Sequence, residues 1–262
     1  MRRFNYVGGG GRLLSSAQAF LEGCKNNKTC YNSDMYHHDY NGVSMKRMRA
    51  FTLAEVLVTL GIIGVVSAMT VPSLMQNYQR QSYVTQLHKV YNEFSQALLR
   101  YQNDKNAINL TEAGLNSQAQ MNSFMSSYFK VVQTCTNSLT PCFIEQNTYK
   151  KISGVALSSA YTVTNSYVLA SGASIRFLYA PSGDKIGNIM VDINGQKGPN
   201  ILGRDLFTIA VFKNGMMDDT GATAPLSKDT RNTLYTSNCA SAENNAWGCF
   251  GKILNDNWEM TY

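Results

Sequence analysis

The sequence predicts an α+β fold in which one long N-terminal helix packs on a C-terminal antiparallel β-sheet. A segment without any charged residue runs from Val56 to Gln79. An amphipathic pattern with helical spacing follows it, over residues 80–103. The rest of the chain, residues 104–262, changes to short β-branched and aromatic runs that are separated by Gly-containing turns. We therefore expect the first half of the helix to span a membrane and the second half to face the sheet.

The uncharged segment is long enough to cross a bilayer. Its 24 residues would span about 36 Å as a helix, against a hydrocarbon core of about 30 Å. Lys46, Arg47 and Arg49 precede it, and Arg80 is the next charged residue after it. This asymmetry favours a cytoplasmic N-terminus, with most of the chain on the other side. Length and flanking cations argue against the core helix of a soluble protein, while an ordinary signal anchor stays open.

The residues at the start of this segment carry a specific motif, Ala50-Phe51-Thr52-Leu53-Ala54-Glu55-Val56-Leu57. It resembles the processing site of the type IV pilin and pseudopilin superfamily, and the resemblance extends from Lys46 to about Gln79. It implies that a membrane aspartyl protease cuts between Ala50 and Phe51 and that the new amino terminus of Phe51 is N-methylated. The residue before the cut is usually Gly in this family, whereas here it is the similarly small Ala50.

The resemblance also implies roles in assembly for Glu55, Gly64 and Pro72. A carboxylate inside a membrane segment is costly and is usually kept for a function. Glu55 would face the α-amine of a neighbouring subunit, where a buried charge pair fixes the register between helices. Pro72 is expected to kink or melt the helix between Gly64 and Pro72. Alternatively, Gly61 and Gly64 are positions where membrane helices pack closely.

The distribution of charge argues against nucleic-acid binding. Residues 1–50 contain 8 Lys and Arg against 3 Asp and Glu, whereas residues 51–262 contain 15 against 14. The part after the cut is therefore almost neutral and has no basic stripe. It also lacks a nucleophile elbow and a Gly-rich phosphate loop, its only histidine is His88, and Asp218 and Asp219 do not suggest a catalytic cleft. We expect no catalytic residues and no enzymatic activity.

Four of the six cysteines follow the cut: Cys135, Cys142, Cys239 and Cys249. An even number in a translocated domain suggests two disulfides. Three pairings are open, and the local one, Cys135 with Cys142 and Cys239 with Cys249, is favoured because it closes the shortest loops. A zinc site is the rival interpretation, but the sequence contains no C-x-x-C pair.

The first residues, 1–44, have no apolar core of a secretory signal. The run Gly8–Gly11 and the mixture of Asn, Tyr and Cys suggest disorder. Our hypothesis is that translation begins at Met45. The leader is then the short cationic segment 45–50, and residues 51–79 form the membrane half of the helix.

The long helix is expected to end at residues 103–106. A second helix is expected near residues 117–130. Strands are expected at 161–163, 167–170, 173–179, 186–193 and 206–212. Their turns are Ser171-Gly172, Asn194-Gly195 and Asn214-Gly215, so the strands should form an antiparallel meander. The part after Asp218 is expected to be loop-rich, held by a Cys239–Cys249 bridge and by Trp247 and Trp258.

One segment, residues 192–205, resembles a loop seen in many pseudopilin-like sequences. It collects oxygen donors of the kind that calcium prefers, Asp192, Asn194, Asn200 and Asp205. Some secretion pseudopilins hold calcium in their C-terminal module. The alternative is that Asn-Gly and Gly-Pro only form turns and that Asp205 pairs with Arg204 or Lys197. Calcium is thus the one cofactor that the sequence suggests.

Taken together, the resemblance implies a pseudopilin of a type II secretion filament, placed in the inner membrane with its head in the periplasm. Its partners would be the prepilin peptidase and methylase, other pilin-like subunits and an inner-membrane assembly platform. A pilus subunit for adhesion, motility or DNA uptake, exposed outside the cell, is the second interpretation. A signal-anchored periplasmic binding module that never polymerises is the third.

Overall fold

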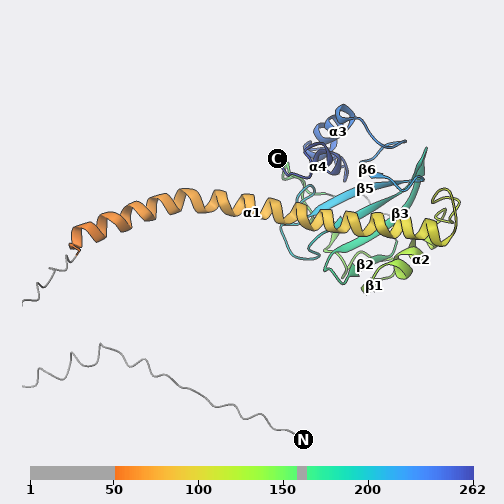
Figure 1. Ribbon diagram of the computed structural model, residues 1–262, viewed down its shortest axis with the longest axis horizontal. Helices are drawn as coiled ribbons and strands as arrows, with labels where there is room; N and C mark the ends of the chain where they lie inside the picture. Colours follow the sequence, from red (N-terminus) through yellow and green to blue (C-terminus); the bar gives the residue numbers. More distant parts are fainter. Residues whose placement is uncertain (1–50, 158–163) are drawn as a thin grey trace, which may run out of the picture. The chain divides into compact units, whose positions relative to one another are not determined.

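The computed structural model describes residues 51–157 and 164–262 (Figure 1). The expected strand at residues 161–163, the residues before the expected cut and the proposed start at Met45 lie outside them. The described residues form an α+β fold, in which a long helix, α1 (Leu53–Asp104), precedes a sheet of six antiparallel strands. The pilin-like fold class expected from the sequence is confirmed.

The two halves of α1 differ in what surrounds them. Every residue from Phe51 to Gln79 is exposed, and this half contains a window with a mean hydropathy of 2.0, so α1 is long and apolar enough to cross a membrane. The second half buries one face against the head, and this confirms its amphipathic pattern. The buried residues of that face are Val84, Leu87, Val90, Phe94, Ala97, Leu98 and Tyr101.

Of the two outcomes expected between Gly64 and Pro72, melting of the helix is wrong and a kink stays a prediction. The helix continues through Pro72, and the Thr70 hydroxyl donates a hydrogen bond to the Val66 carbonyl at 2.9 Å. Proline removes one N–H from the ladder, but the neighbouring turns keep their hydrogen bonds. One missing bond is therefore not enough to end a helix of 52 residues.

The sheet is a meander in which each strand pairs with the next one in sequence. The strands are β1 (Val131–Cys135), β2 (Ser166–Leu169), β3 (Ser174–Ser182), β4 (Lys185–Asp192), β5 (Leu206–Phe212) and β6 (Met217–Asp218). The strands expected from β2 to β5 are confirmed, whereas the sequence pattern does not predict β1 and β6. The second helix, α2 (Gln118–Tyr128), is capped by Ser117, whose hydroxyl accepts the Gln120 N–H, and a short turn, η1 (Gln146–Thr148), follows β1.

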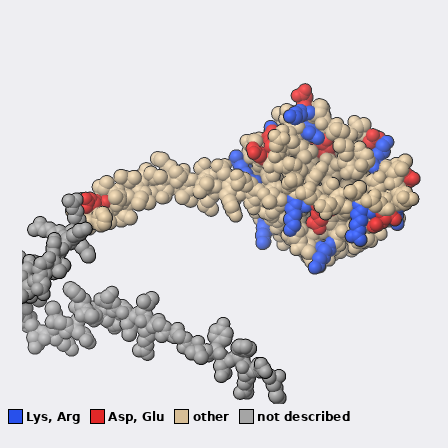
Figure 2. Space-filling view, viewed as in Figure 1, with Lys and Arg blue, Asp and Glu red and all other residues tan. Residues whose placement is uncertain are grey.

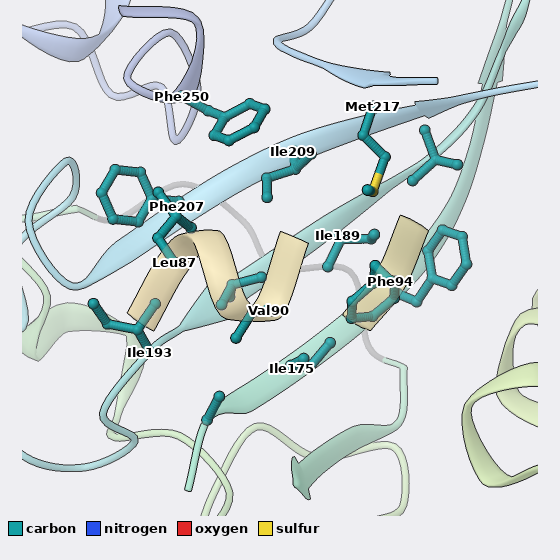
Figure 3. Close-up of a cluster of buried hydrophobic side chains, with 14 of the residues drawn as sticks. Leu87, Val90, Phe94, Ile175, Ile189, Ile193, Phe207, Ile209, Met217 and Phe250 are labelled. Carbon is teal, nitrogen blue, oxygen red and sulfur yellow. The ribbon is translucent and has the colours of Figure 1, made fainter. Parts of the chain in front are cut away.

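The core lies between α1 and the sheet (Figure 3). Leu87, Val90 and Phe94 face strand residues that are fully buried, such as Ile175 and Ile189. Phe94 also packs in an aromatic cluster, with its ring centroid 4.4 Å from that of Phe129 and 6.2 Å from that of Phe177. The helix face and the sheet therefore form one continuous apolar layer.

The region after Asp218 is more regular than expected. It contains α3 (Lys228–Leu234), a π-helical turn η2 (Tyr235–Cys239) and α4 (Phe250–Asn255). Asp218 forms a buried ion pair with Arg231 at 2.6 Å, and Asp219 accepts the N–H groups of Gly248 and Gly251 at 2.9 and 2.7 Å. An ion pair and hydrogen bonds at the end of the sheet thus hold these short helices in place. Such polar interactions leave no hydrophobic periodicity in the sequence from which the helices could be predicted.

Phe94→Ala tests the packing of α1 on the sheet. Because Phe94 is 1% exposed and packs among aromatic rings, its truncation should lower the free energy of unfolding by about 3–5 kcal/mol. The control is Leu99→Ala on the same helix, where a side chain that is 61% exposed should change it by less than about 0.5 kcal/mol. Denaturant unfolding of the detergent-extracted chain measures both values. Equal losses of unfolding free energy in the two variants would contradict the assignment of Phe94 to the buried face of α1.

Candidate processing and assembly site

The start of α1 is closed by a reciprocal pair of side chains, Thr52 and Glu55. The N–H and hydroxyl of Thr52 donate to Glu55 Oε2 at 2.8 and 2.9 Å, and the Glu55 N–H donates to Thr52 Oγ1 at 3.2 Å. This is a capping box, in which each side chain satisfies a backbone N–H of the first helical turn. Sequence reasoning missed it, although the T-x-x-E spacing is its signature.

The capping box gives Glu55 a role inside its own helix. The first N–H groups of a helix have no partner within it, and such groups are costly in hydrocarbon, where water is absent. A carboxylate at this end also complements the positive end of the helix dipole. A cut before Phe51 would release an α-amine. The expected partner of Glu55 is this α-amine on a second subunit. Phe51 is 84% exposed, and Ala50 lies outside the described residues.

The three residues with expected assembly roles do not share one face of α1. Glu55 and Gly64 are nine positions apart in sequence, a rotation of about 180° around an α-helix. An added Cβ at Gly61 or Gly64 would meet no atom within 4 Å, so neither glycine packs against another part of the described chain. Close approach at either glycine therefore requires a partner. Contacts at Glu55 and Gly64 would surround the helix, as in a bundle.

The head carries two disulfides in the local pairing that the sequence favours. Cys135 is bonded to Cys142 with a Cα–Cα distance of 6.1 Å, and Cys239 to Cys249 with 5.0 Å. The first ties the end of β1 to the loop that follows it, and the second links η2 to the start of α4. All four cysteines are buried.

In the loop expected to bind calcium, residues 192–205, both aspartates accept hydrogen bonds from protein donors. Asp192 accepts the Tyr149 hydroxyl at 2.6 Å and the Asn194 N–H at 3.3 Å. Asp205 accepts the N–H groups of Asn200 and Ile201 at 2.6 and 2.7 Å. In place of the alternative pairing of Asp205 with Arg204 or Lys197, backbone donors bind this carboxylate.

Burial dominates the electrostatics of this loop. Asp192 and Asp205 are fully buried. Burial raises the pKa of Asp192 to about 8; the hydrogen bond from Tyr149 opposes this rise, and the nearby Asp205 adds to it. Burial also raises the pKa of Asp205, against the hydrogen bonds from Ile201 and Asn200. A group that is close to neutral at neutral pH is a poor ligand for a hard cation.

The donors present do not fit a calcium ion well. The side-chain oxygens of Asn194 and Asn200 are buried and lack a hydrogen-bond partner among the described residues. Both carboxyl groups, however, are already occupied by protein donors. Within residues 51–157 and 164–262, no group of three or more His, Cys, Asp or Glu side chains is placed to hold a metal. Calcium binding by this loop is therefore an untested sequence prediction, and the filled carboxyl groups lead us to expect no binding.

Comparison with known proteins identifies the N-terminal segment. Residues 45–71 match the family model of the prokaryotic N-terminal methylation motif. Neither a curated protein nor a solved structure matches the chain. The match covers the expected leader, the expected cleavage position and the first part of α1. The chain therefore carries the type IV pilin and pseudopilin signature, and the motif implies a structural subunit that prepilin peptidase processes.

The raised pKa of Asp192 predicts that the head loses stability as the pH rises. The folded state holds a proton with a pKa of about 8, whereas an unfolded Asp releases it near pH 4, so the stability contributed is complete below about pH 4 and is lost up to about pH 8. Inside this window one proton changes the free energy of unfolding by about 1.4 kcal/mol per pH unit. Unfolding curves between these pH values measure the slope.

The matched controls are Asp192→Asn and Asp184→Asn. The first removes one buried titrating group and should lower the slope by the contribution of one proton, whatever it does to absolute stability. The second replaces a partly exposed carboxylate that pairs with Lys213, and it should leave the slope unchanged. A slope that survives Asp192→Asn undiminished would show that this carboxyl is ionised in the folded head.

Calcium titration tests the loop directly. Because N–H and O–H donors fill both carboxyl groups, we expect millimolar calcium to leave the melting temperature unchanged and Asp205→Asn to give the same result. A rise in melting temperature with calcium that disappears in Asp205→Asn, while magnesium has no effect, would establish a calcium site here.

Proposed function

We propose that this chain is a structural subunit of a type IV pilin-like filament, assembled through the first half of α1. The observation that carries the proposal is the exposed apolar stretch between Phe51 and Gln79, which begins with the capping box of Thr52 and Glu55. Burying one large apolar side chain is worth about 1.5–3 kcal/mol. A helix with such side chains on every face needs either lipid or other helices around it.

The same helix serves two environments in this proposal. Before the cut, Lys46, Arg47 and Arg49 hold the N-terminus on the cytoplasmic side of the membrane. Prepilin peptidase removes them and leaves the α-amine of Phe51, together with Glu55, nearly neutral as a pair. An inner-membrane assembly platform then moves the subunit from lipid into a bundle of pilin-like helices. The head would lie in the periplasm, or outside the cell in a surface pilus.

The finer assignment that we propose is a type II secretion pseudopilin. It is supported by residues 192–205, which resemble a pseudopilin loop and are held in the head by the buried bonds of Asp192 and Asp205. The second candidate is a surface pilus subunit, which two disulfides in the head favour, because covalent closure stabilises a domain outside the cell. Mechanical shearing distinguishes them: a surface pilus is released into the medium, whereas a pseudopilus stays with the cell.

Variants of the capping box test assembly. Glu55→Gln keeps a side chain that can accept the Thr52 N–H but removes the charge, so the subunit should be cut and inserted normally. Without the carboxylate charge, the α-amine of the neighbouring subunit would lose its partner between the packed helices, so filament yield should fall strongly. Thr52→Ala is the matched control: it removes the capping hydroxyl, keeps the charge and should still assemble. Crosslinking of subunits in cells, with quantification of filaments, measures both.

Three outcomes would contradict the proposed role of Glu55 in assembly. If Glu55→Gln assembles and Thr52→Ala does not, Glu55 serves only to cap its own helix. If Glu55→Val retains full function without crosslinked multimers, the chain is a signal-anchored module that does not polymerise. If Glu55→Gln is left uncut, the lost assembly reflects processing rather than register between helices.

A further inference from the structure

Two grooves flank α1 where its apolar segment ends. The first has a volume of about 480 Å³ and is lined by Asn77, Arg80, Gln81 and Trp258 among others. The second has a volume of about 490 Å³ and is lined by Gln79, Tyr83, Pro199 and Arg204 among others. Each groove thus combines one arginine, one aromatic ring and at least one side-chain amide. The C-terminus lies beside α1 at this end of the head in Figure 1.

The two arginines lack an anionic partner in the described residues. Among the ion pairs there, none involves Arg80 or Arg204. Both residues are half-buried, and Arg80 Nε is buried without a hydrogen-bond acceptor in this part of the chain. A buried donor without an acceptor costs free energy, more so on a charged group. An anion supplied from outside the chain would relieve this cost.

The grooves lie at the level where lipid headgroups are expected. If residues 56–79 occupy the hydrocarbon, a rise of about 1.5 Å per residue places Arg80 about 2 Å beyond it, within the headgroup layer, and Val84 about 8 Å beyond it, at the outer edge of that layer. Arginine beside an apolar span extends toward phosphate groups, and Trp and Tyr concentrate at the same depth. Figure 2 shows Lys and Arg side chains on the head beside the point where α1 enters it.

We propose that these two grooves seat the head on the phospholipid headgroups of the membrane, with headgroup phosphates against Arg80 and Arg204. Trp258 and Tyr83 then lie at the depth of the interface. No acidic side chain is among the described residues that line the second groove, while the first also contains the exposed carboxylate of Glu259. The inference rests on the membrane anchoring in the proposed function. It implies that a subunit breaks these headgroup contacts when it leaves the bilayer for a filament.

Fluorescence of the full chain in vesicles tests the proposal. Trp247→Phe leaves Trp258 as the only tryptophan, and Trp258→Phe leaves Trp247, which lines neither groove. Both variants are reconstituted in vesicles of phosphatidylethanolamine and phosphatidylglycerol whose acyl chains carry bromine close to the ester end. Flotation with the vesicles and resistance to alkaline extraction establish insertion. We expect bromine to quench Trp258 and to leave Trp247 largely unquenched.

Arginine variants of the Trp247→Phe chain test the phosphate contacts. A basic residue near an anionic lipid surface contributes about 1 kcal/mol, so Arg80→Gln and Arg204→Gln should each lower the ratio of docked to undocked heads about fivefold. Arg100→Gln is the matched control, because Arg100 lies on the same helix, beside Asp104 and away from both grooves. It should leave the quenching unchanged.

Each other result overturns the inference. Equal quenching of Trp258 and Trp247 in inserted protein, or quenching that both arginine variants leave intact, would show that the grooves do not contact headgroups. Quenching of Trp258 that depends on the ratio of protein to lipid would assign the grooves to a second copy of the chain. Failure to float with the vesicles would overturn membrane anchoring itself, and the docking with it.

Discussion

The exposed apolar half of α1 is the constraint on which the rest of this structure depends. Every residue from Phe51 to Gln79 is exposed, and no charge interrupts the segment after Glu55. Exposure of this many large apolar side chains would cost tens of kcal/mol in water, whereas a folded domain is stable by only about 5–15 kcal/mol. The segment therefore requires lipid or neighbouring helices. A removable cationic leader and a single carboxylate are consistent with a helix that uses both.

The head, residues 104–262, packs against the second half of α1. The second half of α1 forms one layer of the core, so the membrane segment continues directly into the packed domain. The C-terminal region is joined to the rest of the head by polar bonds: Arg231 pairs with Asp218, and the buried Lys151 ammonium donates to the carbonyls of Asn238 and Glu243. Burial lowers the pKa of Lys151, the direction expected for an ammonium removed from water.

Sequence reasoning is most successful where one physical signal dominates. The helical period over residues 80–103 and the strand at Leu206–Phe212 agree with the structure because burial on one face or on both faces leaves a clear pattern. It fails for β1, β6 and the helices after Asp218, which are short and held by tertiary contacts. The candidate site shows the same division: the motif around Glu55 is evident in the sequence, whereas the bonds that close the Asp192–Asp205 loop depend on Tyr149, which is distant in sequence.

The mass of the intact protein, extracted from the membranes of cells that contain prepilin peptidase, tests the central claim most directly. We expect the mass of residues 51–262 plus one methyl group, less the four hydrogens lost in forming two disulfides. A protein that keeps Lys46, Arg47 and Arg49 under these conditions would contradict it, because that leader would hold α1 in the membrane as a permanent anchor.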